Sequence, residues 1–426
     1  MQLGLSPLRV AAPARTPAME VLIGALLFGS TVYFSSNALL LLPLLLLAMG
    51  AVPFRGRTSL VLVGAFSLLA LLNVLFNMGA FDPERHGSSL AVILVVAVAL
   101  LAPSLPDRAL KVFVVATCLE VLVGALEYQM GQVALTAGQV NLSNQELSLD
   151  SALLYDLRVF GLSANSSSLA EKVFISILLT LAIPDLFRRR WLPLALLALG
   201  LYLSFNRTAI ACTLLFLLLS VRRQHLSGRS GVFVLGAVLA SLLTVASNLE
   251  ELVLQFTRGN TEELSHSELS RLYFWAKSLE LIELNPFFGN GSMTFRVEDF
   301  ITGQPQHAHN SFLVVAATHG LLPAAFLLSY VAINLNGFNW RVIVVMLTFS
   351  MTQYFVFWNL SVADLILFWF LAQRLQPDDA ITRATTRAAT LPDRLANSRP
   401  GARPGEGPTV QSQPSPGPSP NPMGAQ

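Results

Sequence analysis

The sequence predicts an all-α polytopic membrane protein with about twelve transmembrane helices and one large helical outer loop. Hydrophobic residues make up 54% of the 426 residues and charged residues only 12%. A soluble protein has about 25% charged residues, so this chain has too few to cover a water-facing surface of its size. The apolar residues are also gathered in runs close to the roughly 20 residues that cross a bilayer.

The predicted spans follow from these runs, and shorter ones are accepted where a helix is tilted or interrupted. They lie near 19–34, 37–54, 58–80, 88–104, 108–131, 164–184, 191–205, 207–221, 231–247, 311–333, 342–358 and 360–375.

Most of the 27 lysine and arginine residues fall on one side of the membrane if the N-terminus is cytoplasmic. Short cytoplasmic loops are rich in these residues, so the distribution fixes the orientation. It predicts a cytoplasmic N-terminal segment (1–18), a transmembrane domain (19–375) and a cytoplasmic tail (376–426). The tail is rich in Pro, Gly, Ser and Thr without apolar periodicity, and we expect it to be disordered.

Residues 191–221 form an almost continuous apolar run that is interrupted only at 204–208. As one helix the run would be roughly 46 Å long, against a hydrocarbon core of about 30 Å. We therefore expect two spans with the polar break, which contains Arg207, at the outer surface.

The two long outer loops are 132–163 and 248–310, and the second carries more acidic than basic residues. Within it, leucine and isoleucine recur at helical spacing from Ser267 to Leu284, and Asn285-Pro286 ends the pattern. A helix with Ser267 as its N-cap is predicted there.

Several function classes are disfavoured by composition. A net charge of +2 gives no electrostatic support for a nucleic-acid partner. Cys118 and Cys212 are far apart inside apolar runs, so we interpret both as small core residues.

Arginines on the outer side oppose the usual distribution, and near hydrocarbon they are costly. Arg207 at the span break either snorkels to cap a helix or meet lipid phosphate, or binds an anionic ligand. Arg271, one helical turn before Trp275, is either on a solvated helix face or at the same anion. Arg158, just before the sixth span, also resembles an ordinary interface charge.

The segment 306–310 places His307 and His309 where the large loop meets the tenth span. A base or hydrogen-bond donor suits histidine there, and a metal site is weakly supported because no carboxylate or cysteine lies at ligand spacing. His319 is interpreted as a packing residue. Glu171 and Lys172 are candidates to face a cavity, and Asp364 is a weaker one.

Five segments in order resemble the O-antigen ligase and polymerase family: 158–165 with 169–170, 204–209, 270–275, 285–291, and 307–311 closing on 320–322. The resemblance covers about 160–330, and the first five spans match by hydropathy alone. One departure is Asn206, where a serine is commoner before the arginine.

The resemblance implies an enzyme that transfers a glycan from undecaprenyl diphosphate to an acceptor hydroxyl on the periplasmic face of the bacterial inner membrane. It implies inversion at the anomeric carbon, with no metal, nucleotide or other cofactor. Catalytic roles fall on His309, Arg207 and Arg271. Substrate-binding roles fall on Arg158, Asn165, His307 and Trp275.

The acceptor decides between a ligase, which uses a lipid A core or another anchor, and a polymerase, which uses a second lipid-linked repeat. Chain length and the single dominant outer loop favour the ligase slightly. A transporter of polysaccharide or lipid-linked sugar is the alternative from another class, since twelve spans with both termini inside is a common transporter arrangement. Neither a clear internal repeat nor midplane polar sites support it.

Overall fold

The computed structural model describes residues 7–8, 16–32, 57–76, 105–130, 159–163, 165–183, 185–220, 266–291, 297–298, 305–306, 308–353 and 361–375. The chain divides into two compact units, Met1–Leu375 and Gln376–Gln426, and all of these residues belong to the first. The predicted spans 37–54, 88–104 and 231–247 lie outside the described residues, as do most of the loop 132–163 and the tail.

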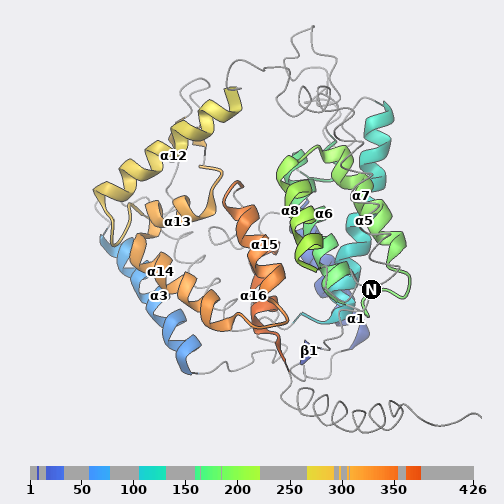
Figure 1. The fold of residues 1–426 in the computed structure, drawn as a ribbon, viewed down its shortest axis with the longest axis horizontal. Coiled ribbons are helices and arrows are strands. Elements are labelled where there is room, and N and C mark those ends of the chain that lie inside the picture. Colours follow the sequence, from blue (N-terminus) through green and yellow to red (C-terminus); the bar gives the residue numbers. More distant parts are fainter. Residues whose placement is uncertain are drawn as a thin grey trace, which may run out of the picture. The chain divides into compact units, whose positions relative to one another are not determined.

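The predicted all-α class is confirmed for the part of the chain that the structure describes (Figure 1). Its helices are α1 (Pro17–Gly29), α3 (Arg57–Phe76), α5 (Asp107–Met130), α6 (Ser166–Ala182), α7 (Trp191–Ser204), α8 (Arg207–Ser220), α12 (His266–Leu284), α13 (Ser311–His319), α14 (Leu321–Asn334), α15 (Trp340–Ser350) and α16 (Val362–Ala372). Two antiparallel pairs of two-residue strands accompany them: β1 (Pro7–Leu8) with β4 (Arg374–Leu375), and β2 (Val297–Glu298) with β3 (Pro305–Gln306).

Two of these helices, Thr58–Phe76 within α3 and Asp107–Met130, are long and apolar enough to cross a membrane. Shorter apolar helices coincide with the predicted spans that begin near 19, 191, 207, 342 and 360. The count of twelve spans remains a prediction. The predicted loop helix is present as α12, although it begins at His266, so Ser267 lies inside it rather than before it.

The predicted tenth span, 311–333, is wrong as a single helix, because it consists of α13 and α14 separated at Gly320. Gly320 has φ +92° and ψ 166°, a conformation that is essentially restricted to glycine. The loop 286–291 packs into this break. Hydropathy alone cannot reveal such a break, because apolar residues continue on both sides of it.

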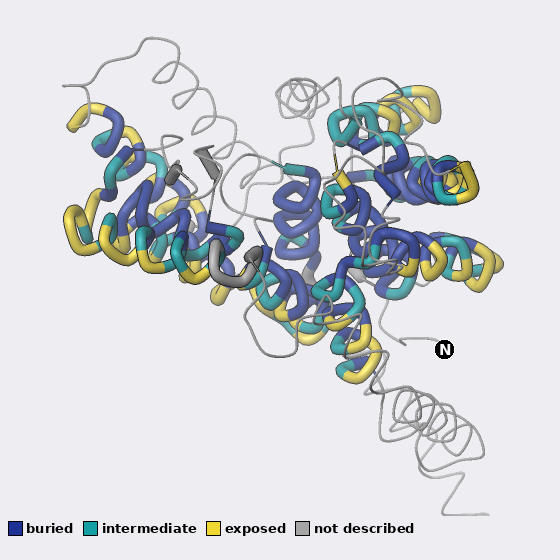
Figure 2. Tube along the Cα trace, turned by 90° about the horizontal axis from the view of Figure 1, so that it is seen from above, coloured by how far each residue is buried: buried dark blue, intermediate teal, exposed yellow. Residues whose placement is uncertain are grey.

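Helix α6 lies at the centre of one packed group, where it contacts α5, α7, α8 and α16. Its side chains from Leu169 to Thr180 are almost all buried, and those of α16 are buried along nearly its whole length. In a second group, α14 contacts α3 and α13, and α13 contacts α12. Many described helices are buried on one side and exposed on the other (Figure 2).

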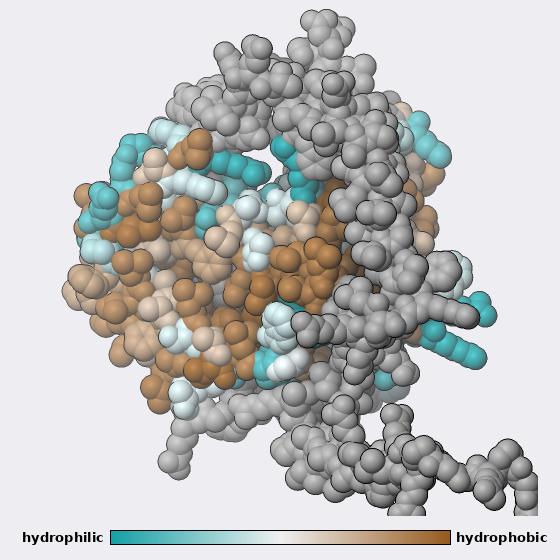
Figure 3. Space-filling view, viewed as in Figure 1, coloured by the Kyte–Doolittle hydropathy of each residue, from teal (hydrophilic) through white to brown (hydrophobic). Residues whose placement is uncertain are grey.

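The exposed sides of several helices are themselves apolar. Large hydrophobic side chains that are about half exposed include Leu68 on α3, Leu119 on α5, Leu218 on α8 and Leu328 on α14. In Figure 3, hydrophobic side chains cover α3 and α14, whereas hydrophilic ones gather around α12. Apolar outer surfaces of this extent are typical of helices that face lipid. Cys118 and Cys212 are both buried and free, as predicted for core residues.

Candidate functional site

Arg207 is the first residue of α8, directly after a sharp break in the chain. Helix α7 ends at Ser204, Phe205 adopts the left-handed conformation with φ 47°, and Asn206 follows. The Asn206 Oδ1 accepts a hydrogen bond from the backbone N–H of Ala209 at 3.0 Å, which makes Asn206 the N-cap of α8. The predicted division of residues 191–221 into two helices is thus confirmed. The left-handed Phe205 and the capping Asn206 produce it.

His309 lies at a break of the same construction before α13. It has φ 48°, and the following Asn310 caps α13 by accepting from the N–H groups of Phe312 at 3.0 Å and Leu313 at 3.1 Å. Phe205 and His309 are the only residues other than glycine with positive φ in the described ranges. Each such residue costs about 1–3 kcal/mol of backbone strain, and strain of this kind clusters at functional sites.

The C-terminal end of α15 joins these two breaks. The Thr352 hydroxyl lies 3.3 Å from the hydroxyl of Thr208, the residue after Arg207. Ser311 lies two residues after His309, and its hydroxyl donates to the backbone oxygen of Gln353 at 3.4 Å. Two consecutive residues therefore contact the starts of both α8 and α13, and this brings the breaks at Arg207 and His309 to the same end of α15.

Helix α12 is attached to the same place through Trp275. The Trp275 indole N–H donates to the backbone oxygen of Ala308 at 2.8 Å, next to His309. Phe274 is buried against Ala308 and two residues of α13. Arg271, one turn before Trp275 on α12, is thereby held on the element that contacts the His309 break. The substrate-binding role predicted for Trp275 is untested, and its N–H is engaged by this bond.

Helix α12 carries an ion pair among its exposed residues. Lys277 donates to Glu280 at 2.6 Å, and this hydrogen bond raises the pKa of the exposed lysine. The pair contributes little to stability at an exposed position. The exposed residues of α12 also include Leu272 and Leu284, whereas Phe274 and Ser278 are buried.

The loop 286–291 and Gly320 lock together at the break between α13 and α14. Gly291 donates to the backbone oxygen of Thr318 at 3.1 Å, and Leu321 donates to that of Pro286 at 2.7 Å. A Cβ on Gly289 would clash with Thr318, and one on Gly320 would clash with Phe287. The segment Gly289-Asn290-Gly291 is thus a structural clasp that holds the break between α13 and α14. His319 is buried beside Phe66, as predicted for a packing residue.

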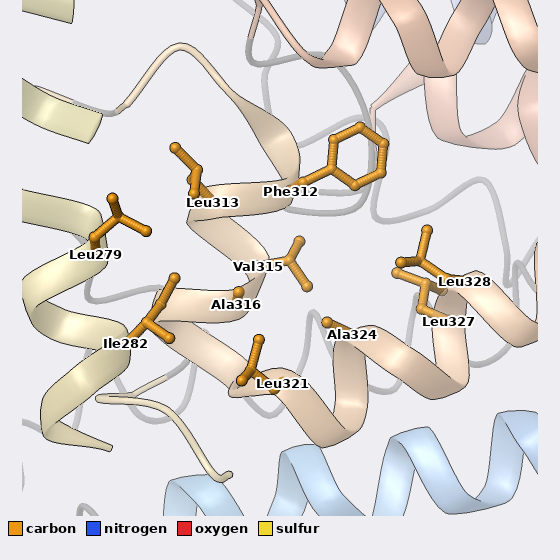
Figure 4. A pocket seen from close by; sticks show the side chains of 10 residues that line it. All are labelled: Leu279, Ile282, Phe312, Leu313, Val315, Ala316, Leu321, Ala324, Leu327 and Leu328. Atoms are coloured by element: carbon orange, nitrogen blue, oxygen red, sulfur yellow. The ribbon is translucent and has the colours of Figure 1, made fainter. Parts of the chain in front are cut away.

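An apolar groove of about 360 Å³ runs between α12, α13 and α14 (Figure 4). Leu279 and Ile282 come from α12, and the remaining walls come from α13 and α14. Phe312 and Leu313, whose N–H groups Asn310 caps, belong to its lining. The groove therefore begins one turn from His309. Its residues are Leu279, Ile282, Phe312, Leu313, Val315, Ala316, Leu321, Ala324, Leu327 and Leu328.

Other predicted site residues have separate positions. Arg158 and His307 lie outside the described residues. Asn165 is the N-cap of α6 and accepts from the N–H of Ser168 at 2.8 Å, so a capping role accounts for it. Across the described ranges, no three His, Cys, Asp or Glu side chains come together as metal ligands would.

Two of the remaining acidic and basic candidates, Lys172 and Asp364, have structural partners. Lys172 is buried and forms an ion pair with Glu120 at 2.6 Å. Asp364 and Ser361 form a reciprocal capping box at the start of α16.

The sequence motifs did not identify two buried carboxylates on α5, Glu120 and Glu127. Glu120 and Glu127 are fully buried, and both accept hydrogen bonds from the segment 160–163. The sequence could have indicated both residues, because they lie in an apolar span. An ionisable side chain there costs free energy and is usually kept for a structural or functional role.

The O-antigen ligase family matches residues 192–329, which contain Arg207, Arg271 and His309. None of the curated proteins matches the chain. Proteins of this family are integral membrane proteins, in agreement with the apolar outer surfaces of the helices. The match contains four of the five segments that carry the resemblance, and over residues 192–329 the chain is similar to the O-antigen ligase family.

Proposed function

We propose that this protein is a membrane glycosyltransferase of the O-antigen ligase type, with undecaprenyl-diphosphate-linked glycan as donor. In this proposal it transfers the glycan to an acceptor hydroxyl at the periplasmic face of the inner membrane, with both termini cytoplasmic. The observation that supports it is a set of contacts between the segments that carry Arg207, Arg271 and His309. Thr208, Ser311 and Ala308, which are neighbours of these candidates or of their segments, bond to Thr352, Gln353 and Trp275.

In the proposed reaction, Arg207 and Arg271 bind the donor diphosphate. The planar guanidinium fork suits bidentate contact with phosphate oxygens. Arg207 also begins a helix, whose N-terminus favours negative charge. Charge grows on the diphosphate as the glycosidic bond breaks, and preorganised cations stabilise that leaving group.

His309 is the proposed general base, which accepts the proton of the attacking hydroxyl. A sugar hydroxyl has a high pKa and attacks poorly unless its proton is removed during bond formation. Attack from the face opposite the diphosphate inverts the anomeric carbon. The left-handed backbone at His309 supports this role, because strained backbone conformations of this kind cluster at active sites. The proposed chemistry uses neither metal nor cofactor.

The apolar groove provides a place for the first isoprene units of the donor lipid. It is lined only by apolar side chains and begins one turn from His309, at the start of α13. Leu321 and Leu328, which line it, are also 47% and 42% exposed on α14. A lipid chain can therefore lie in the groove and continue along the outer face of α14.

A transporter is less well supported, even though α13 and α14 are a broken helix pair of the kind that transporters use around a substrate. At this break the backbone groups bond to the loop 286–291 and to Asn73, which donates to the Thr318 oxygen at 3.0 Å. The break is thus filled by protein.

The surface glycan of a strain that lacks the protein distinguishes a ligase from a polymerase. For a ligase we expect long lipid-linked chains to accumulate while long chains disappear from the anchor. Retention of one-repeat material on the anchor would instead identify a polymerase. Unchanged surface glycan and unchanged lipid-linked pools would contradict both.

A further inference from the structure

The buried carboxylates of α5 form a cradle for the segment 160–163. The Glu127 Oε2 accepts from the N–H groups of Phe160 at 3.0 Å and Gly161 at 2.7 Å. The Glu120 Oε1 accepts from the Leu162 N–H at 3.0 Å and from the Ser163 hydroxyl at 2.8 Å. Two carboxylates seven residues apart on one helix thus hold four consecutive residues.

Lys172 on α6 completes this cradle. Its ammonium lies 2.7 Å from one Glu120 oxygen and 2.6 Å from the other. The ammonium also lies 5.1 Å above the ring of Phe28 on α1. Lys172 thus places an opposite charge beside Glu120, which is fully buried.

The fit of the segment against α5 is close. Gly161 has φ +60°, and a Cβ there would lie 2.8 Å from the Glu120 side chain. The backbone therefore approaches Glu120 more closely than any other residue type would allow. Packing alone does not require carboxylates here, because ionisable side chains are costly inside an apolar span.

Val159, the residue directly before the held segment, contacts the end of α7, just before Arg207. The Val159 N–H donates to the backbone oxygen of Leu203 at 3.4 Å. Arg207, which is predicted to bind the donor diphosphate, follows Leu203 after only Ser204, Phe205 and Asn206. Displacement of the segment would therefore remove the support on one side of this break.

We propose that Glu127 and Glu120 are positioning residues, which hold 160–163 against the α7 end and so fix the Arg207 break for donor diphosphate. The inference rests on the proposed function. It adds two residues of α5, outside the segment 192–329 that matches the family, to the donor-binding apparatus. Neither carboxylate touches the donor in this account.

The test measures binding of undecaprenyl diphosphate to the full-length protein in lipid nanodiscs. Glu127→Ala should raise Kd about tenfold, as expected when hydrogen bonds to a charged group are lost. Glu127→Asp keeps the charge but shortens the side chain by one methylene, and should also raise Kd. Glu127→Gln keeps an oxygen that accepts from both N–H groups, and should stay within about twofold of wild type.

Thr117→Val is the matched control, because Thr117 is equally buried on α5, one turn before Glu120, and its hydroxyl bonds within α5, to the Phe113 oxygen at 3.0 Å. Its Kd should equal that of wild type. Hydrogen exchange at the amides of 160–162 should accelerate in the Ala and Asp variants and remain slow in the Gln variant.

The outcomes separate the two proposals. If wild type binds undecaprenyl diphosphate and the Ala and Asp variants bind it equally well, the positioning role is overturned while the donor assignment stands. A Gln variant that binds as weakly as the Ala variant while exchange at the amides of 160–162 stays slow would also overturn the role, since the segment would be held without fixing the donor site. Absence of binding by wild type would overturn the donor assignment, and the inference with it.

Discussion

At the scale of single residues, the site depends on two short segments with one conformation: a left-handed residue, then a buried asparagine that caps the next helix. Asn206 and Asn310 are both 9% exposed, and their side chains fix where α8 and α13 begin. Because the cap determines the first helical residue, it also determines where Arg207 and His309 lie. Asn206, the one departure from the family pattern, thus keeps an N-capping side chain, as the commoner serine would.

Arg207→Lys tests the role of the guanidinium at this scale. The charge is kept and the bidentate fork is lost, so we expect transfer to fall by at least about tenfold, the loss of one charge-assisted hydrogen bond. Membrane insertion and the amount of folded protein should be unchanged. The measurement is glycan transfer by purified protein at matched expression. Wild-type transfer by this variant would remove Arg207 from the site.

At the scale of elements, the sequence located most described helices but not the way they meet. Apolar runs and the Asn285-Pro286 stop indicated α5, α7, α8 and α12 nearly to their ends. The break at Gly320 was missed because its cause lies in another segment, the loop 286–291, which inserts there. Periodicity describes one segment at a time and cannot report such an insertion.

Gly320→Ala tests the clasp between that loop and the broken helix pair. The new Cβ would clash with the Phe287 oxygen at a backbone conformation restricted to glycine, so stability should fall by at least about 2 kcal/mol. The melting temperature in detergent is the measurement. Gly64→Ala on α3 is the control, because nothing lies within 4 Å of its Cβ position and no loss is expected. Equal melting temperatures for the two variants would contradict the clasp.

The groove is tested by Leu279→Trp, which places an indole between α12 and α13. Leu279 is 51% exposed, so the larger ring fits without disrupting the core, yet it should obstruct a lipid chain. We expect the KM for lipid-linked donor to rise by about fivefold or more. This corresponds to the binding free energy lost when roughly one or two CH₂ groups of the lipid are no longer buried. Leu284→Trp, 71% exposed on the same helix and outside the groove, should leave KM unchanged. Identical donor KM values for both variants would place the lipid elsewhere.

At the scale of the whole molecule, the candidate site joins residues far apart in sequence. The motifs named Arg207, Arg271 and His309, but nothing in the sequence indicated that Thr352 and Gln353 contact two of these three segments. Glu120 and Glu127 carried a visible signal as charges in an apolar span, yet their partners in 160–163 become evident only once the chain is folded. Local motifs therefore predicted the reactive groups, and tertiary contacts supply their supports.

The central claim is metal-independent transfer with His309 as base. The measurement that tests it most directly is glycan transfer by the purified protein in nanodiscs, with and without a chelator. Wild type should be indifferent to chelator, and its rate should fall at acid pH because a protonated imidazole cannot accept the hydroxyl proton. His309→Ala and His309→Asn should both lose at least about 100-fold in rate while still binding undecaprenyl diphosphate. His309→Asn should melt no lower than wild type, because asparagine tolerates the left-handed conformation. Chelator-sensitive transfer that a divalent ion restores, or full activity of His309→Asn, would contradict the account.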